Sequence, residues 1–160
     1  MSVHLELATP GDCDEILELL PRLASFDLPD CRNPDHLWGG DAEMLRNWAQ
    51  NGNENCLVHI AKEADGKIVG LAVVTLQEEM LSHAPSAHLE VIVVAESAEG
   101  HGVGKDLLQA AESDARERGA LSMSLHVFST NKRARRVYKR AGYDEELIRS
   151  IKPFTKDALS

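Results

Sequence analysis

The chain has 160 residues, a hydrophobic fraction of 43%, three cysteines and a formal net charge of −9 at pH 7. This length and composition suit one globular domain over residues 1–160 and exclude extensive disorder. The negative charge argues against a nucleic-acid partner. The lack of a leader pattern or of an apolar run of about 18 residues argues against a membrane partner, so we expect a soluble cytoplasmic protein. The cysteines are odd in number and widely spaced, so we expect neither a disulfide framework nor a metal site built from clustered cysteines.

The charge is unevenly divided along the chain. Residues 1–104 carry 5 Lys and Arg against 18 Asp and Glu, whereas residues 105–160 carry 12 against 8. A basic part attracts a polyphosphate, and an acidic part favours a cationic partner such as an amine. Chance variation of surface composition explains the division equally well.

The first third of the chain predicts one strand and two helices. Val3–Ala8 predicts a strand, and Thr9 followed by Pro10 is typical of a helix start. The apolar spacing of this first helix is interrupted by Pro21, which predicts a kink or an early stop. Residues 27–40 have the composition of a loop, Asp41 is expected to cap a second helix ending near residues 51–52, and Trp38 and Trp48 are expected to pack.

The rest of the chain alternates strands and helices. Strands are predicted over residues 56–64, 67–77, 87–94, 121–127 and 143–151, and helices over residues 103–118 and 131–141. A hairpin turn is expected at Asp65-Gly66, and Gly119 and Gly142 are expected to end the two helices. On the last helix Ala134, Val137, Tyr138 and Ala141 form the expected apolar face. This order predicts an α/β (α+β) fold with a mixed, mostly antiparallel central sheet flanked by helices.

Three glycines, Gly100, Gly102 and Gly104, separate the apolar strand 87–94 from the helix that follows. A strand, a glycine turn and a helix together direct backbone N–H groups toward an anion. A Walker A loop fails because Glu99 stands at its first glycine and Asp106 at its serine or threonine. A Rossmann fingerprint fails because no glycine stands at its third position in either frame.

A third pattern, [QR]-x-x-G-x-[GA] before a helix with an early leucine pair, fits Gly102-Val103-Gly104 and Leu107-Leu108. His88–Val94 resembles a central strand that precedes this pattern, and the chain from Asn131 to Tyr143 fits N-x-x-A-x-x-x-Y-x-x-x-G-[FY]. On these segments the chain resembles the GNAT superfamily of acyl-CoA-dependent N-acetyltransferases. The resemblance spans most of the chain and is weakest over residues 27–55 and after residue 150.

The resemblance implies direct transfer of an acetyl group from acetyl-CoA to an amine of a small molecule or a protein, with no metal. It also implies that the backbone of the strand end binds pantetheine, that the turn binds the pyrophosphate, and that the last helix contributes two further contacts. The implied cofactor residues are Ile92, Val93, Val94, Gly100, His101, Gly102, Val103, Gly104, Lys105, Asn131 and Tyr138. Family members often pair, so a homodimer is compatible with the resemblance.

Two residues are the candidate catalytic groups. Tyr138 matches a tyrosine that in many family members protonates the departing thiolate, and a phenol with a pKa of about 10 suits that task. Packing is its alternative role, as helix capping is for Asn131. Glu90 and His88 lie two apart on a strand and share a face opposite to Leu89, Val91 and Val93. We prefer Glu90 as the base, directly or through water, with His88 and a purely structural Glu90 as alternatives.

Glu99 departs from the family pattern because an acid replaces the usual glutamine or arginine. A carboxylate cannot donate to a phosphate and repels it, so backbone N–H groups are expected to carry the binding. Six cations between Lys132 and Arg140 either contact the CoA 3′-phosphate or form a solvated helix face. Two other functions also fit the sequence: a non-catalytic acyl-CoA sensor and a protein-interaction module. The acceptor pocket is expected at residues 27–55 and 78–86.

Overall fold

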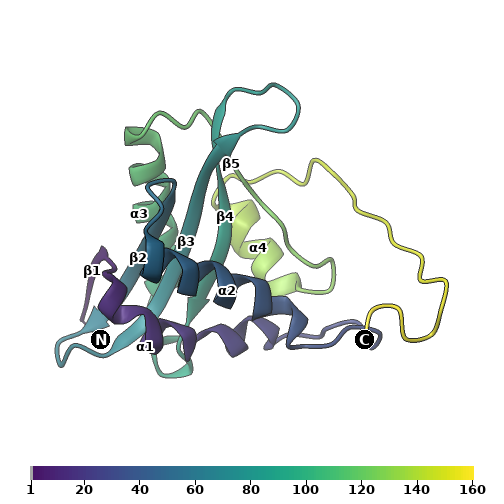
Figure 1. Cartoon of the computed structure of the whole chain (residues 1–160), viewed down its shortest axis with the longest axis horizontal. Helices are drawn as coiled ribbons and strands as arrows, with labels where there is room; N and C mark the ends of the chain where they lie inside the picture. Colours follow the sequence, from purple (N-terminus) through teal and green to yellow (C-terminus); the bar gives the residue numbers. More distant parts are fainter. Residues whose placement is uncertain (1) are drawn as a thin grey trace.

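The computed structural model describes residues 2–160, so Met1 lies outside the described part of the predicted domain. Its sheet runs β1-β2-β3-β4-β5 in spatial order as in the sequence, with β5 parallel to β4 and the other pairs antiparallel (Figure 1). The strands are β1 (Val3–Leu7), β2 (Cys56–Glu63), β3 (Ile68–Glu78), β4 (Pro85–Val94) and β5 (Met123–Leu125). The predicted mixed, mostly antiparallel sheet is confirmed.

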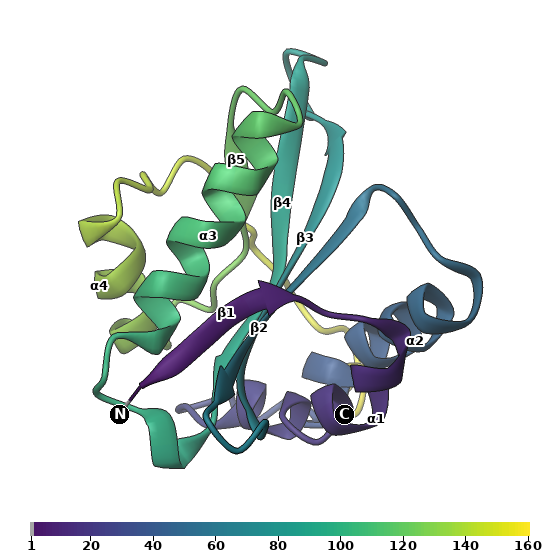
Figure 2. The same cartoon turned by 90° about the vertical axis from the view of Figure 1, so that its left-hand side faces the viewer.

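Helices cover both faces of this sheet (Figure 2). They are α1 (Cys13–Leu17), α2 (His36–Asn51), α3 (Val103–Glu117) and α4 (Lys132–Arg140), with 3₁₀ turns η1 (Pro10–Asp12), η2 (Leu20–Ala24) and η3 (Glu96–Ala98). Ile16, Leu20 and Leu45 are fully buried on the α1–α2 face, and Leu107 is fully buried on the α3 face. Each such side chain stabilises the fold by about 1.5–3 kcal/mol.

Glycine 70 lets α3 approach the sheet closely. A Cβ atom on Gly70 would lie 2.7 Å from Leu107 Cδ1 and 3.1 Å from Val103 Cγ1. Because α3 begins directly after the glycine turn, this close packing also fixes where the turn lies against the sheet.

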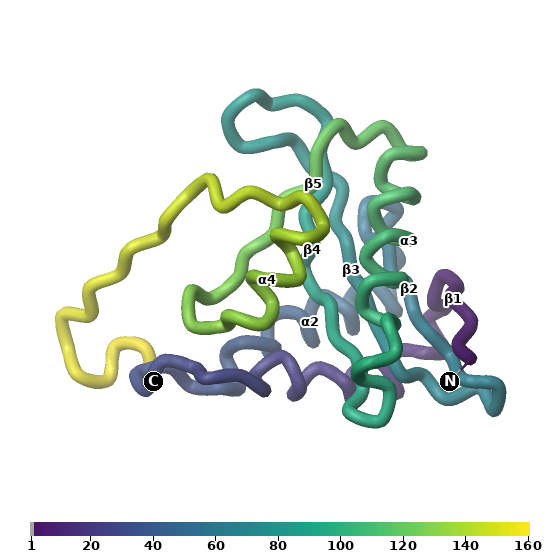
Figure 3. Tube along the Cα trace, turned by 180° about the vertical axis from the view of Figure 1, so that it is seen from behind, coloured from purple at the N-terminus to yellow at the C-terminus, as the bar shows by residue number. Residues whose placement is uncertain are grey.

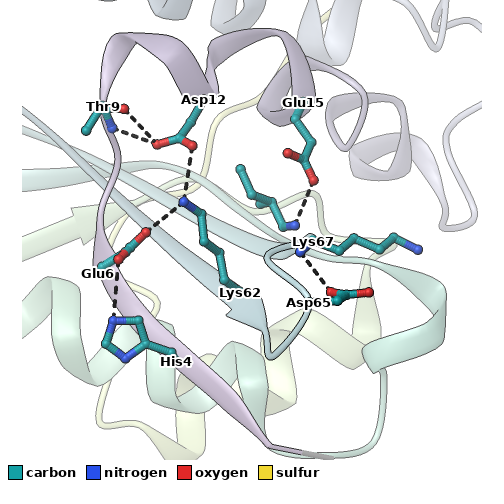
Figure 4. Close-up of polar contacts among 9 residues, drawn as sticks. His4, Glu6, Thr9, Asp12, Glu15, Lys62, Asp65 and Lys67 are labelled. Carbon is teal, nitrogen blue, oxygen red and sulfur yellow. Dashed lines mark hydrogen bonds and ion pairs between the residues drawn. The ribbon is translucent and has the colours of Figure 1, made fainter.

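The N-terminal segment is divided into short turns and held by ion pairs. Pro21 lies in η2, so the expected interruption of the first helix is confirmed. Lys62 Nζ lies 2.8 Å from Glu6 Oε1 and 3.3 Å from Asp12 Oδ1, and Glu15 accepts a hydrogen bond of 2.8 Å from the Ile68 N–H (Figure 4). These contacts join η1 to β2 and α1 to the start of β3, and they set the position of the chain that leads into η2.

The second helix begins earlier than the sequence predicts. The helix α2 starts at His36, so the expected cap Asp41 lies inside it and that prediction is wrong. Asn33 Oδ1 instead accepts from the Asp35 N–H at 3.0 Å, which starts the chain turning before His36. Trp38 and Trp48 pack against the core of this face, as expected.

The C-terminal third holds less regular structure than the sequence predicts. The strand expected over residues 121–127 is limited to β5, with Leu121 exposed. Residues 143–151 form no strand, because the chain after Gly142 leads away from β5, its nearest sheet edge (Figures 1 and 3). The expected apolar face of α4 is only partly covered: Ala134 and Tyr138 are half-buried, and Val137 is exposed.

The turns agree with the sequence predictions better than the C-terminal strands do. The hairpin at Asp65-Gly66 is confirmed and has Gly66 at φ +90°, while Gly119 and Gly142, both at φ +95°, follow α3 and α4. These left-handed conformations strongly favour glycine.

Candidate functional site

The central strand β4 contains a bulge at Glu90. Val73 of β3 lies opposite Val91 and the next residue, Val74, lies opposite Leu89, so Glu90 is the extra residue. A bulge of this kind reverses the alternation of side chains along a strand. The placement of Leu89 and Val91 on one face is therefore wrong: Leu89 packs on the α3 side, whereas Val91 packs on the α1–α2 side.

Beyond the bulge, one edge of β4 has no strand beside it. The parallel pairing with β5 covers Ala87–Leu89, and the chain after β5 diverges from β4 (Figure 3). The Ala95 N–H donates to the Val69 carbonyl at 2.8 Å. Antiparallel ladders alternate, so the N–H and C=O groups of Ile92 and Val94 point toward the open edge. An extended ligand can hydrogen-bond there without any particular side chain.

The open edge leads through η3 into the glycine turn. Gly100 and Gly102 both have φ +77°, and Gly102 precedes α3 without a capping side-chain hydrogen bond. The first N–H groups of a helix have no intrahelical partner. Those of Val103–Lys105, at the positive end of a 15-residue helix, therefore form a site suited to a diphosphate.

Glu99 is paired with an arginine from a distant part of the sequence. Arg22 Nη2 lies 2.6 Å from Glu99 Oε1, and Arg22 Nε donates to the Val94 carbonyl at 2.8 Å. Arg133 Nη1 lies 3.8 Å from the same Glu99 oxygen. The repulsion expected from Glu99 is thus offset. Arg22 was not predicted from the sequence, where the only signal was an unexplained acid at the position of the family's glutamine or arginine.

The α1–α2 side of the bulge holds a second acid beside Glu90. Thr75 Oγ1 donates to Glu90 Oε1 at 2.7 Å. Burial, with the nearby charge of Glu90, raises the pKa of Asp41 to about 6 and that of the Cys56 thiol to about 11. This region is therefore electronegative, and Cys56 stays protonated and unsuited to act as a nucleophile. Asp41 was missed as a site residue because it was assigned to a helix cap.

His88 lies on β4, two residues before Glu90. Its Nδ1 lies 2.8 Å from Ser124 Oγ, and its ring centroid lies 4.8 Å from that of His126. Burial lowers the pKa of His88 although Glu90 opposes the shift, so the imidazole is neutral at pH 7. The geometry leaves both His88 and Glu90 as candidate bases.

Tyr138 lies on α4, half-buried against the core of the α3 side. Its ring meets that of Tyr143 edge-on, with 6.1 Å between the centroids, and burial raises the pKa of Tyr138. The phenol therefore keeps its proton at neutral pH, as a general acid must. Asn131 Oδ1 accepts from the Ala134 N–H at 3.2 Å, which confirms its capping role.

Two further features bear on the expected partners. Among residues 2–160, no three His, Cys, Asp or Glu side chains are grouped closely enough to hold a metal ion. Within the same part of the chain, no helix has the length and apolarity needed to cross a membrane.

Three solved structures illustrate the likeness of this fold to known proteins. A candidate acetyl transferase from Pyrococcus furiosus is 22% identical, with 96% of this chain and 100% of that chain covered and a TM-score of 0.77. The ribosomal-protein-alanine N-acetyltransferase from Brucella melitensis biovar Abortus 2308 is 19% identical, with coverages of 96% and 100% and a TM-score of 0.69. AAC(6')-Iy, in complex with the bisubstrate analogue CoA-S-monomethyl-acetylneamine, is 21% identical, with coverages of 96% and 99% and a TM-score of 0.70.

At these identities the structures show a shared fold. The sequence itself gives the family, because a model of the Acetyltransferase (GNAT) family matches residues 15–143. The match includes the bulged strand, the glycine turn and the segment from Asn131 to Tyr143, and this family uses acetyl-CoA. The chain therefore belongs to the GNAT family of acetyltransferases.

Proposed function

We propose that this protein transfers an acetyl group from acetyl-CoA to a primary amine by direct attack within a ternary complex. The observation that carries the proposal is the open edge of β4 after Glu90, which runs into the glycine turn. An extended pantetheine arm matches the edge, and a diphosphate matches the turn. Both features support acetyl-CoA as the co-substrate, with Ile92–Val94 and Gly100–Lys105 as its main backbone contacts.

Acetyl-CoA, when bound, supplies an activated acyl group on a sulfur that leaves as a thiolate. Glu90, or His88 beside it, accepts the proton that the attacking ammonium must lose, directly or through water. Backbone N–H groups at the open edge of β4 polarise the acyl carbonyl, and Tyr138 donates a proton to the leaving sulfur. No covalent intermediate on the protein is required, in agreement with the raised pKa of the Cys13 and Cys56 thiols.

The acceptor is proposed to be a cationic amine of a small molecule or a protein. The acceptor is proposed to bind on the α1–α2 side of the bulge. There Asp41 and Glu90 produce a negative electrostatic potential, which favours an ammonium group. Of the similar structures, one is a ribosomal-protein-alanine N-acetyltransferase and another holds a CoA–acetylneamine analogue. These names support a protein amine and an amino sugar as the first two acceptor classes to test.

Calorimetry with acetyl-CoA followed by a thiol-release assay over a panel of amines tests the proposal. The panel should contain polyamines, amino sugars, amino acids and peptides with free N-termini. We expect acetyl-CoA to bind and at least one amine to accelerate thiol release. Binding without turnover on any amine would support the acyl-CoA sensor instead. A wild-type protein that does not bind CoA would overturn the proposal and favour the interaction module.

A further inference from the structure

We propose that Arg22 is a cofactor-site residue: held by Glu99 and the Val94 carbonyl, its guanidinium supplies the positive charge for the CoA diphosphate that Glu99 cannot supply. This inference rests on the proposed use of acetyl-CoA. It assigns a role to a residue far from the glycine turn in the sequence, and it explains how the chain tolerates an acid at a phosphate-binding position.

The two contacts of Arg22 place its guanidinium between the strand end and the turn. Its Nε donates at 2.8 Å to the carbonyl of Val94, which lies at the open edge of β4, and its Nη2 donates at 2.6 Å to Glu99 Oε1. Leu20 anchors the backbone of η2 because its side chain is fully buried. Arg22 is therefore held at the point where an extended arm on β4 would pass into the diphosphate site.

The guanidinium retains the capacity to bind an anion. An arginine carries five N–H donors, and the two contacts use one on Nε and one on Nη2. The side chain of Arg22 is 26% exposed, so the remaining donors are within reach of solvent and of a ligand. Guanidinium groups suit phosphate oxygens because their planar donors match the geometry of two oxygens.

Charge shows why Arg22 matters more than the other cation near Glu99. Arg133 lies 3.8 Å from Glu99 Oε1 and is 71% exposed, so solvent screens its attraction. Among the ion pairs of residues 2–160, Glu99 has only Arg22 and Arg133 as partners. Without Arg22, the Glu99 carboxylate would face the diphosphate with only the exposed Arg133 beside it. The loss of Arg22 should therefore weaken binding in two ways, by removing a donor and by exposing a repulsive charge.

A set of variants tests this assignment by calorimetry with CoA. Arg22→Met should weaken CoA binding roughly 10- to 100-fold, the range for a lost charged hydrogen bond. Glu99→Gln should bind within about 3-fold of wild type, because the backbone and Arg22 remain. The double variant should bind more tightly than Arg22→Met, since the repulsive carboxylate is gone. Arg118→Met is the matched control: Arg118 pairs with Asp114 at 2.8 Å, away from the turn, and its loss should not change CoA affinity.

Two further measurements and one further variant separate the possible failures. Thermal unfolding of ligand-free wild type, Arg22→Met, Glu99→Gln and the double variant should show coupling between Arg22 and Glu99. Arg22→Lys replaces Arg22→Met if that variant does not fold. Pantetheine, which lacks the diphosphate, should bind wild type and Arg22→Met equally. Unchanged CoA affinity in Arg22→Met, or equal weakening toward pantetheine, would overturn the assignment and leave the proposed function intact. Failure of wild type to bind CoA would overturn the proposed function itself.

Discussion

The two halves of β4 differ in what lies beside them, although both are largely apolar and both pair with β3. Residues 85–89 include the segment that pairs with β5, whereas residues 91–94 pair with β3 alone. Glu90, the bulged residue, marks the boundary between them. An edge with N–H and C=O groups available to a ligand can therefore arise where a neighbouring strand diverges, with no special side chain in the strand itself.

The candidate functional groups lie on or beside the second half of β4, residues 90–94, which we call the open half. Glu90 begins it, Arg22 holds the Val94 carbonyl at its end, and the glycine turn follows. The closed half, with Ala87 and Leu89 buried against the α3 side, serves the core. Substitutions near this open half should affect binding and turnover, whereas the matched changes elsewhere should leave both unchanged.

The largest effect is expected from Tyr138→Phe. The loss of the phenol should lower kcat by roughly 10²- to 10⁴-fold if Tyr138 is the sole general acid. Acetyl-CoA affinity should remain near that of wild type. Tyr143→Phe is the control, because Tyr143 donates to Glu112 Oε1 at 2.9 Å and should affect stability alone. Unchanged turnover in Tyr138→Phe would remove this residue from the mechanism and leave packing as its role.

Glu90→Gln is expected to have the next largest effect. The amide keeps the size of the side chain but cannot accept the substrate proton, so kcat/KM should fall by about 10²- to 10³-fold. Steady-state assays with an accepted amine measure this fall. Glu96→Gln, an exposed acid just after the strand, should behave as wild type. Normal turnover in Glu90→Gln together with a loss in His88→Gln would assign the base to His88.

Gly102→Ala tests the geometry of the turn. A non-glycine residue at φ +77° is strained, so the free energy of unfolding of the variant should be lower by about 1 kcal/mol. The variant should also bind CoA more weakly. Gly39→Ala lies inside α2, where a Cβ atom meets nothing within 4 Å, and should stabilise the protein by roughly 0.5–1 kcal/mol. Urea unfolding with and without CoA compares them. An alanine at position 102 that leaves CoA affinity unchanged would contradict the role of the turn.

Asp41→Asn should change stability, and not turnover by orders of magnitude, in a way that depends on pH. Burial raises the pKa of Asp41 to about 6, above its unfolded value of about 3.9, so folded-state stability falls as the pH rises through this window. The amide removes that penalty and should stabilise the protein by about 1–2 kcal/mol at pH 7.5. The difference should shrink toward pH 4 in denaturant titrations. A constant difference across pH would show that the carboxylate of Asp41 is not the cause.

The sequence indicates the fold well where local patterns and the final packing agree. The strand at residues 87–94, the glycine turn and the cap at Asn131 were all predicted, because hydrophobic alternation, left-handed glycines and capping are local properties. The strand expected over residues 143–151 was wrong because a strand also needs a partner edge, which no local pattern reports.

The site was predicted only in part for the same reason. The bulge at Glu90 is a property of register between two strands, so the sequence suggested the wrong faces for Leu89 and Val91. Arg22 reaches Glu99 across 77 positions of the chain, and Asp41 approaches Glu90 through the packing of α2. Contacts of this kind arise from tertiary structure and leave no periodic signal.

Amide hydrogen exchange of Ile92 and Val94, measured by NMR with and without CoA, tests the central claim most directly. Both N–H groups point toward the open edge of β4 and should exchange slowly once an extended ligand bonds to that edge. The amide of Ala87, which already donates to the Ser122 carbonyl at 3.0 Å, should not change. Unchanged exchange at Ile92 and Val94 under saturating CoA would contradict the account of β4 as the docking edge for the cofactor.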